Sequence, residues 1–548
     1  MNRQHHELLW NMVSLLYAKG VRHAILCPGS RNGPIINAFA CFKAITSHSC
    51  VDERSAAYQA LGIAEELMQP VVVVCTSGTA ALNLAPAIAE AFYQHVPLIV
   101  ITADRPAEWI DQLDGQAIRQ TGIYHNHIKA QYSFSDENSH ADTIWHAMRI
   151  VNEAVNTAME LPYGPVHINV PLREPLYLPA GEIPVYDAMP KNIIPTNVTT
   201  ILDQNQISEL CVEFDSYDKV LMLGGQGRIN SLLKNSLSHL SINQNTAIVG
   251  DCLSNLTWIP DLLSISDQAV ASFNADHAPE LLITFGRSIL CRTLKTFLRS
   301  NKPKAHWHIG MEPAADVYQS LTRHIRTSPE YCFKVLVAAN LKNLSRTSYK
   351  NDLLSIISNE HKTYLADNCK PENFTEFSAT KRLLELLPEN EVLHLGNSMA
   401  VRLADRAGVP DKNIEIFCNR GTSGIDGSVS TAVGHALAAP AKHHTLLIGD
   451  LGLFYDINGL WRDTVPANLL IVVLNNHGGR IFETIKGPGN IPQALPFFTT
   501  PHNRSARAVA EMFGLEYMRA GNSEEMEEIF KRVFVMSARA RVVELDFK

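Results

Sequence analysis

The 548-residue sequence lacks several features that would assign it at once to a broad class of protein. It has no run of about eighteen apolar residues, so no segment is expected to span a membrane. Its first residues do not resemble a cleavable signal peptide. Lysine and arginine (47) are outnumbered by aspartate and glutamate (55), and no basic stretch stands out, which argues against a nucleic-acid or membrane partner. The ten cysteines include no Cys-x-x-Cys pair and are expected to be reduced thiols of a cytoplasmic protein.

Helix and strand patterns alternate along the first 178 residues. Strand patterns occur at residues 23–27, 45–51, 71–75 and 98–102, and helical patterns at residues 54–67 and 80–93 lie between them. Such alternation is typical of a parallel sheet with helices on both faces. Six prolines between residues 171 and 195 then favour an extended connector over helix or central strand.

The rest of the chain shows similar patterns. Strand patterns at residues 220–223 and 281–284 predict a central Rossmann-like domain, and the last third again alternates strands and helices. We therefore expect three doubly wound parallel-sheet α/β domains, at residues 1–180, 195–345 and 355–548. In the middle domain, GGQG at residues 224–227 lacks the full dinucleotide fingerprint, and His306 and His308 lack a third metal ligand. A scaffold role is the favoured interpretation of that domain.

Two polar residues at predicted strand ends indicate a metal and diphosphate site in the last domain. Asp450 follows an expected buried strand at residues 443–448, and Asn476 follows the next strand at residues 469–474. Consecutive strands of a βαβ unit end at the same edge of a parallel sheet, where ligands of open α/β folds bind. A carboxylate from Asp450, an amide oxygen from Asn476 and a backbone carbonyl near Gly478 are hard oxygen ligands that suit Mg²⁺ bound to phosphate.

Glu53 is the candidate acid. It stands between a short strand pattern and the helical pattern at residues 54–67. A carboxyl group held in an apolar setting can relay a proton, because desolvation raises its pKa. The alternative is that Glu53 merely complements the positive N-terminus of the helix. Its presence together with the Asp450 and Asn476 signature favours the catalytic interpretation.

Five blocks of the sequence resemble one known family. They are CPGSRNGP (27–34), TSGTAALNLAPAIAEA (76–91), TADRP (102–106), GNSMAVR with NRGTSGIDG (396–402 and 419–427), and GDLGLFYDINGL with NNHGGRIF (449–460 and 475–482). The chain resembles thiamine-diphosphate enzymes of the pyruvate oxidase type, and more closely the 2-succinyl-5-enolpyruvyl-6-hydroxy-3-cyclohexene-1-carboxylate synthases of menaquinone biosynthesis. The likeness spans the whole length, and GDL in place of the more common GDG is typical of these synthases.

The resemblance implies an enzyme that uses thiamine diphosphate together with Mg²⁺ or Mn²⁺. It implies decarboxylation of 2-oxoglutarate and conjugate addition of the resulting succinyl carbanion equivalent to isochorismate. Glu53 is then expected to relay a proton to the aminopyrimidine ring of the cofactor. The family's arrangement further implies a homodimer or homotetramer whose active sites lie between two chains.

The resemblance also assigns roles to single residues. The cofactor-binding residues are implied to be Glu53, Ser77, Gly78, Ile425, Gly449, Asp450, Leu451 and Asn476, with Asp450, Asn476 and Gly478 on the metal. The substrate-binding residues are implied to be Ser30, Arg31, Arg105, Gln116, Arg292, Ser398, Arg402, Arg420, Phe482 and Ile485. Arginine suits two dicarboxylate substrates because its planar guanidinium pairs with carboxylates. Ile425 is implied to bend the cofactor. Taken alone, Arg402 could instead be a solvated surface residue and Ile425 a core residue.

Two other interpretations are retained. One is a different thiamine-diphosphate carboligase or decarboxylase, similar to acetohydroxyacid synthase, which a flavin-binding middle domain would favour. No convincing dinucleotide motif occurs there. The other is a non-catalytic ligand-binding relative, which is expected to have lost Glu53, Asp450 or Asn476. All three residues are present, so the synthase is the preferred prediction.

Overall fold

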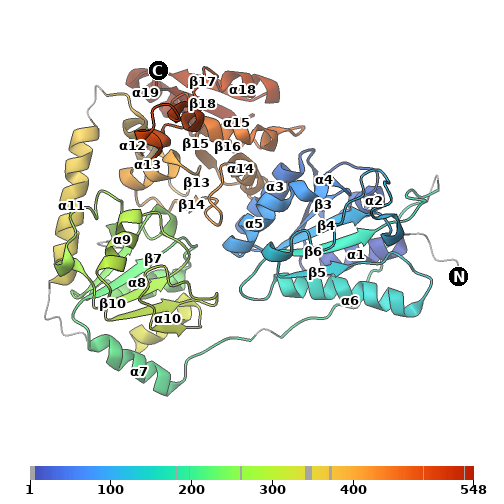
Figure 1. Cartoon of the computed structure of the whole chain (residues 1–548), viewed down its shortest axis with the longest axis horizontal. Coiled ribbons are helices and arrows are strands. Elements are labelled where there is room, and N and C mark those ends of the chain that lie inside the picture. The colour runs from blue at the N-terminus through green and yellow to red at the C-terminus, as the bar shows by residue number, and fades with distance from the viewer. Residues whose placement is uncertain are drawn as a thin grey trace.

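The structure is a computed structural model that describes residues 6–179, 182–196, 198–259, 262–339, 348–369, 373–484, 487–535 and 537–548. Three six-stranded sheets form its framework, and every strand pairing in them is parallel (Figure 1). Helices cover the faces of the sheets, which confirms the predicted doubly wound α/β class. Within these ranges, no helix is both long and apolar enough to cross a membrane.

The first sheet has the strand order β2-β1-β3-β4-β6-β5. Its strands are β1 (His23–Leu26), β2 (Thr46–Ser49), β3 (Val71–Cys75), β4 (Leu98–Asp104), β5 (Ala130–Ser133) and β6 (Val166–Pro171). Its helices are α1 (Glu7–Ala18), α2 (Gly33–Cys41), α3 (Glu53–Leu67), α4 (Thr79–Asn83), α5 (Ala85–Gln94) and α6 (Ala141–Ala158). The single helix expected at residues 80–93 is two helices, because Pro86 opens α5 and has no N–H to continue α4.

The second sheet has the order β12-β11-β10-β7-β8-β9, and the described part of the connector at residues 172–203 contains neither helix nor strand. Its strands are β7 (Val220–Gly224), β8 (Thr246–Gly250), β9 (Leu263–Ser264), β10 (Leu281–Phe285), β11 (Ala305–Ile309) and β12 (Arg323–Ile325). The helices of this part are α7 (Gln204–Asp215), α8 (Ser231–Leu240), α9 (Arg292–Ser300), α10 (Pro329–Ala338) and α11 (Tyr349–Asn368).

Local contacts in the second sheet involve the glycine and histidine residues singled out in the sequence. A Cβ atom on Gly225 would lie 1.8 Å from the carbonyl oxygen of Arg287, so this glycine allows two loops to pack closely. His306 Nε2 and His308 Nδ1 lie 2.9 and 3.0 Å from Thr284 Oγ1 and are hydrogen-bonded to it. Across the described ranges, no group of three or more His, Cys, Asp or Glu side chains is placed to hold a metal ion.

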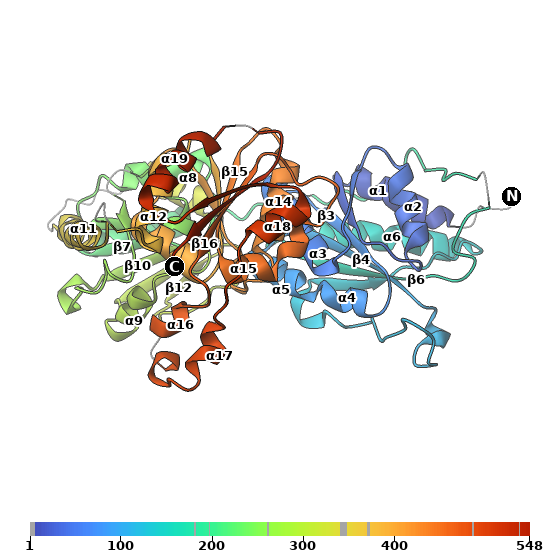
Figure 2. The ribbon, with the colours of Figure 1, turned by 90° about the horizontal axis from the view of Figure 1, so that it is seen from above.

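The third sheet has the order β14-β13-β15-β16-β18-β17. Its strands are β13 (Val392–Leu395), β14 (Glu415–Phe417), β15 (His444–Gly449), β16 (Leu469–Asn475), β17 (Glu516–Ala520) and β18 (Arg541–Asp546). Its helices are α12 (Glu376–Leu386), α13 (Met399–Ala407), α14 (Ser428–Ala438), α15 (Asp450–Tyr455), α16 (Ile481–Thr484), α17 (Leu495–Thr499), α18 (Arg507–Phe513) and α19 (Ser523–Val533). Figure 2 shows α16 and α17 projecting together from this sheet.

The first and last sheets are joined by the packing of α3 against α14, although the two helices are far apart in sequence (Figure 1). A Cβ atom on Gly62 would lie 2.2 Å from the carbonyl oxygen of Thr431. A Cβ atom on Gly434 would lie 2.2 Å from that of Gln59. The two helices therefore approach each other through reciprocal glycines. This contact fixes the first domain against the domain that carries Asp450.

Candidate active site

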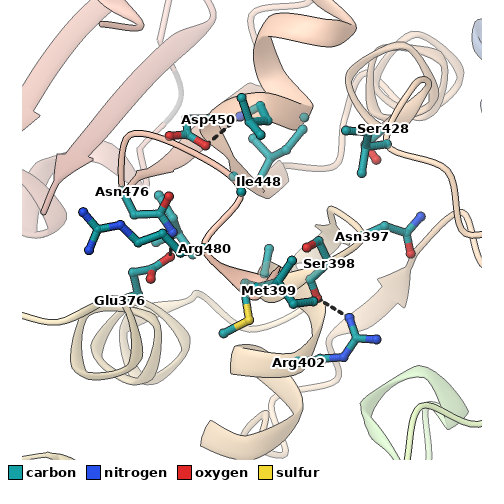
Figure 3. Close-up of a pocket in the computed structure, with 18 of the residues that line it drawn as sticks. Glu376, Asn397, Ser398, Met399, Arg402, Ser428, Ile448, Asp450, Asn476 and Arg480 are labelled. Atoms are coloured by element: carbon teal, nitrogen blue, oxygen red, sulfur yellow. Dashed lines mark hydrogen bonds between the residues drawn. The ribbon is translucent and has the colours of Figure 1, made fainter. Parts of the chain in front are cut away.

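A cavity of about 400 Å³ opens at the carboxyl edge of the third sheet (Figure 3). All the described residues that line it lie between positions 376 and 482. It is built from the loops that follow β13, β14, β15 and β16, which is where ligands of open α/β sheets bind. Ten of the predicted site residues line it: Ser398, Arg402, Arg420, Ile425, Gly449, Asp450, Leu451, Asn476, Gly478 and Phe482.

Asp450 lies where β15 ends, and the residue is only 2% exposed. Its carboxylate accepts hydrogen bonds from the backbone N–H groups of Leu451 (2.7 Å) and Gly478 (2.9 Å). His502 Nε2 lies 3.2 Å from the same carboxylate. Burial raises the pKa of Asp450, while these donors lower it. A carboxylate oxygen keeps further lone pairs after accepting one hydrogen bond, so Asp450 can still bind a cation.

Asn476 follows β16 and lies next to Asp450 in the cavity (Figure 3). Its Nδ2 donates a hydrogen bond to Glu376 Oε1 at 2.9 Å. Its Oδ1 is buried and accepts no hydrogen bond from any residue that the structure describes. A buried acceptor without a partner costs about 1–3 kcal/mol. Because the unpaired oxygen lies beside a carboxylate, the donor set fits a hard divalent cation.

The α13 side of the cavity is cationic. Arg402 Nη1 donates to the Ser398 carbonyl (2.6 Å), and Arg420 Nη1 donates to Asn397 Oδ1 (3.0 Å). Within the described part of the chain, neither guanidinium has a carboxylate within 4 Å. Burial lowers the pKa of Arg402, and the nearby charge of Arg420 lowers it further. Asp267 and Asp251 act on Arg402 and Arg420 only from beyond salt-bridge distance, so both guanidinium groups can still pair with an anionic ligand.

Three residues in or next to this cavity have an unusual backbone conformation. The backbone φ values of Ser398, Ser423 and His477 are 75°, 65° and 65°, which residues other than glycine seldom adopt. Such strain costs of order 1–3 kcal/mol per residue and is typically found at functional sites. Ile425, in the same loop as Ser423, is 36% exposed and lines the cavity, so it is not a core residue.

Glu53 is the first residue of α3 and does not line the cavity of its own chain. The cap of α3 is Asp52, whose Oδ1 accepts from the N–H groups of Arg54 (2.9 Å) and Ser55 (3.2 Å). Glu53 is therefore not needed as the capping residue. Its half-buried carboxylate accepts a hydrogen bond from Asn83 Nδ2 at 3.5 Å.

The other predicted first-domain residues lie along the carboxyl edge of the first sheet. Ser77 is buried, and its hydroxyl has no hydrogen-bond partner in the part of the chain that the structure describes; Gly78 has a φ of 85°. A Cβ atom on Gly78 would lie 3.2 Å from the carbonyl oxygen of Gln116, so this residue packs beside it. Arg105 donates to the Gly115 carbonyl at 2.7 Å.

The remaining predicted residues also lie outside the cavity. Ser30 is exposed, whereas Arg31 is buried and donates to the Leu172 carbonyl at 3.0 Å. Arg292 is exposed at the start of α9 in the middle domain. Ile485 lies outside the described residues. The structure thus gathers one set of predicted residues in the last domain and leaves a second set at the edge of the first.

Several cavity residues are not among the predicted site residues, and Glu376, Ser423 and Arg480 are three of the polar ones. Ser423 and Arg480 lie inside matched sequence blocks, which is a signal that could have identified them. Glu376 lies outside every block and opens a helix more than seventy residues before Asp450. Nothing in the sequence indicated its position beside Asn476.

Known proteins resemble the chain over nearly its whole length. The N-terminal TPP binding domain of thiamine pyrophosphate enzymes matches residues 10–131, and the C-terminal TPP binding domain matches residues 406–545. A Cytophaga hutchinsonii protein named 2-succinyl-5-enolpyruvyl-6-hydroxy-3-cyclohexene-1-carboxylate synthase is 38% identical, and the match covers 98% of this chain and 96% of that protein. Synthases of the same name from Christiangramia forsetii (34% identical; 98% and 95% covered) and Phocaeicola vulgatus (38%; 94% and 91%) are also similar. The chain therefore belongs to the 2-succinyl-5-enolpyruvyl-6-hydroxy-3-cyclohexene-1-carboxylate synthase family of thiamine-diphosphate enzymes.

Proposed function

We propose that the protein decarboxylates 2-oxoglutarate and adds the remaining four-carbon unit to isochorismate in menaquinone biosynthesis. The products are 2-succinyl-5-enolpyruvyl-6-hydroxy-3-cyclohexene-1-carboxylate and CO₂. The observation that carries the proposal is the cavity that holds Asp450 and Asn476 together with the cations Arg402 and Arg420. Both substrates are dicarboxylates, and guanidinium groups with no described carboxylate in salt-bridge range are suited to bind them.

The divalent cation, Mg²⁺ or Mn²⁺, would be held by Asp450, Asn476 and Gly478. The cation would in turn bind the diphosphate of the cofactor. The unpaired Asn476 Oδ1 supports this assignment. Thiamine diphosphate, when bound, would supply an acidic thiazolium C–H whose carbon, once deprotonated, is a nucleophile for a 2-oxo group. Ile425 presents an exposed aliphatic side chain on which the cofactor can bend, and Gly449 and Leu451 border the same space.

Glu53 would hold and transfer a proton at its carboxylate beside the aminopyrimidine ring. Because every residue that lines the cavity belongs to the last domain, the acid has to come from another surface. We propose that a second copy of the chain supplies it, so that a homodimer or homotetramer carries sites between two chains. Ser77 and Gly78 would then contact the cofactor from the same side as Glu53.

The arginines would bind and orient the substrates. Arg402 on α13 and Arg420 in the loop after β14 would hold substrate carboxylates, and Ser398 and Phe482 line the same cavity. The first domain of the other chain would contact the substrates through Ser30, Arg31, Arg105 and Gln116. Further substrate contacts are proposed for Arg292 and Ile485. Closure of two domains around the substrates would exclude water from the reacting atoms.

One assay tests the proposal. The purified protein, with thiamine diphosphate and Mg²⁺, is supplied with 2-oxoglutarate or pyruvate, with and without isochorismate. Release of CO₂ should require 2-oxoglutarate and should be coupled to loss of isochorismate. Equal use of pyruvate, which lacks the distal carboxylate, would instead support a carboligase similar to acetohydroxyacid synthase.

Variants of Arg402 and Arg420 test whether these two side chains bind the substrate carboxylates. Arg402→Ala or Arg420→Ala should lower kcat/KM by about 10- to 150-fold, because one charge-assisted hydrogen bond contributes roughly 1.5–3 kcal/mol. Arg406→Ala is the matched control, since this residue lies one turn further along α13 and does not line the cavity. If the control lost as much activity as Arg402→Ala, the substrate role of Arg402 would be rejected.

A further inference from the structure

Glu376 lies in the cavity without an evident structural task. It is the first residue of α12, and its half-buried side chain lines the cavity beside Asn476 (Figure 3). The N-terminus of α12 is already capped, because the Thr375 hydroxyl accepts a hydrogen bond from the N–H of Ser378 at 3.1 Å. The position of Glu376 is therefore not explained by helix capping.

The contact between Glu376 and Asn476 determines which way the amide faces. An ionised carboxylate only accepts hydrogen bonds, so it selects the NH₂ group of the amide, and Asn476 Nδ2 donates to Glu376 Oε1 at 2.9 Å. Asn476 Oδ1 then has to point away from Glu376. That oxygen is buried, has no partner among the described residues, and shares the cavity with Asp450.

A flipped amide would be unfavourable at both of its ends. Asn476 Oδ1 would meet the carboxylate oxygens of Glu376, and two acceptors repel each other. The NH₂ group would face the cation and would offer it no lone pair. The orientation that satisfies Glu376 is thus the same one that presents an oxygen ligand to a metal ion.

We propose that Glu376 is a positioning residue that locks the Asn476 amide with its oxygen toward the divalent cation. This inference rests on the metal assignment in the proposed function and names the group that orients one of its ligands. Partners that orient metal ligands typically change metal affinity by about 10- to 100-fold when they are removed. Glu376 acts through Asn476 and does not itself touch the substrate or the cofactor.

The test measures metal binding directly and needs no turnover. Mn²⁺ is titrated by calorimetry and by electron paramagnetic resonance into the full-length protein saturated with thiamine diphosphate and free of substrate. Glu376→Ala should weaken Mn²⁺ binding by about 10- to 100-fold. Glu376→Gln should keep most of the affinity, because its amide oxygen can still accept the Asn476 hydrogen bond. Glu483→Ala, which removes a nearby exposed carboxylate that does not line the cavity, should leave the affinity unchanged.

A second pair of variants, made in the Asn476→Asp protein, distinguishes an orienting role of Glu376 from an effect of its negative charge. In Asn476→Asp, either oxygen of the new carboxylate can face the cation, so no orienting partner is required. Adding Glu376→Ala to that variant should no longer weaken Mn²⁺ binding. An equal loss in the Asn476→Asp background, or an equal loss for Glu376→Gln and Glu376→Ala, would overturn the proposal and identify Glu376 as a charge or a direct ligand. Unchanged binding in Glu376→Ala would overturn it too.

The outcomes also separate this inference from the proposed function. If the parent protein binds Mn²⁺ but does not consume isochorismate, the proposed reaction fails and the positioning role is still measured. If Asp450→Ala binds Mn²⁺ as tightly as the parent protein, the metal assignment fails and the role of Glu376 fails with it.

Discussion

Two neighbouring acidic residues at the start of α3 have different tasks. Asp52 caps the helix, whereas the Glu53 carboxylate makes no capping bond. We predict that Glu53→Gln keeps the fold and the cofactor affinity but lowers turnover by about 10²- to 10⁴-fold, because an amide cannot relay a proton. Asp52→Ala is the control: it should destabilise the protein by roughly 1 kcal/mol and retain turnover per folded site. Steady-state kinetics and calorimetric cofactor titration would measure both effects. Near-normal turnover in Glu53→Gln would reject the acid assignment.

Single residues also show where sequence reasoning succeeds. Asp450 and Asn476 could be predicted to lie together, because each follows an apolar strand run and neighbouring parallel strands end at one edge. Glu376 could not, since its role depends on a contact between a helix start and a strand end 100 residues apart. The catalytic role of Glu53 stays a prediction.

Among the helices, the contact of α3 with α14 tolerates no added side-chain atom. We predict that Gly62→Ala or Gly434→Ala destabilises the protein by about 1–3 kcal/mol, because the new Cβ would lie 2.2 Å from a carbonyl oxygen on the facing helix. Gly521→Ala should be nearly neutral, since its nearest neighbour would be 3.8 Å away. Thermal unfolding would compare the three variants. A melting temperature for Gly62→Ala equal to that of Gly521→Ala would show that the helices can move apart at little cost.

The loop that carries Arg420 and Ile425 is held from the first domain by Glu90. The fully buried Glu90 carboxylate accepts hydrogen bonds from the N–H of Gly421 (2.8 Å) and from the N–H (2.6 Å) and hydroxyl (2.5 Å) of Thr422. The cavity wall formed by this loop therefore depends on a residue more than 300 positions away in the chain.

We predict that Glu90→Gln raises the KM for 2-oxoglutarate by roughly 10-fold or more, because its NH₂ group would face backbone N–H donors and displace the loop. Thr422→Val removes only one donor and should have the smaller effect. Kinetics with 2-oxoglutarate would test this. An unchanged KM in Glu90→Gln would mean that Asn397, which donates to the carbonyls of Asn419 and Gly424, holds the loop alone.

The elements themselves were largely predictable from apolar periodicity. The run at residues 71–75 became β3, and the run at residues 469–474 became β16 with one more residue. The helix expected at residues 80–93 was wrong in one respect, because Pro86 divides it. The helix that follows Asp450, α15, ends at Tyr455 and is followed by a short 3-10 helix at Ile457–Leu460. The predicted domain limits stay a prediction.

At the scale of the whole molecule, an ionic cluster joins all three domains. His435 lies between the carboxylates of Glu65 and Glu66, at 3.2 and 3.3 Å. Further bonds link Lys442 to Glu66 and Glu415, and Arg228 to Glu415 and to two backbone carbonyls of α3. Members of this cluster come from α3, from the loop after β7, and from the last domain around α14.

The cluster predicts a defined pH dependence of stability. Burial lowers the pKa of His435, but its hydrogen bonds to Glu65 and Glu66 outweigh burial and raise the pKa overall. A raised histidine pKa stabilises the fold fully below about pH 6.5, and this stabilisation is lost as the pH rises through the folded-state value. Burial opposes ionisation of Glu66, yet its bonds to His435 and Lys442 lower its pKa to about 2. The contribution of Glu66 is present above about pH 4.3 and is lost as the pH falls toward 2.

We therefore expect thermal stability to fall from pH 6 to pH 8 in the parent protein, and to fall less in His435→Gln. Melting temperatures of the two proteins in the same buffers at several pH values would test this. Identical pH slopes would show that His435 does not change its protonation between the folded and unfolded states in this range.

The separation of Glu53 from the cavity leads to a prediction about assembly. Glu53→Gln and Asp450→Ala should each be inactive, but mixing them under subunit exchange should restore about a quarter of the sites, since half of the dimers are mixed and each holds one intact site. Mass spectrometry would verify the mixed dimers, and the activity of the mixture would be compared with that of each variant alone. Verified mixed dimers without activity would mean that each site is completed within one chain.

The packing of α3 on α14 has a consequence for how the protein is made. The chain leaves the ribosome from its N-terminus at about 5–20 residues per second, and roughly 370 residues separate Gly62 from Gly434. For about 20 to 75 s, therefore, α3 exists without the helix that covers it. During that interval the glycine-lined face of α3 is open to solvent. Glu90 is exposed as well, because the loop at Gly421 that covers it in the folded protein has not yet been made. A nascent chain paused before α14 would present this surface to molecular chaperones.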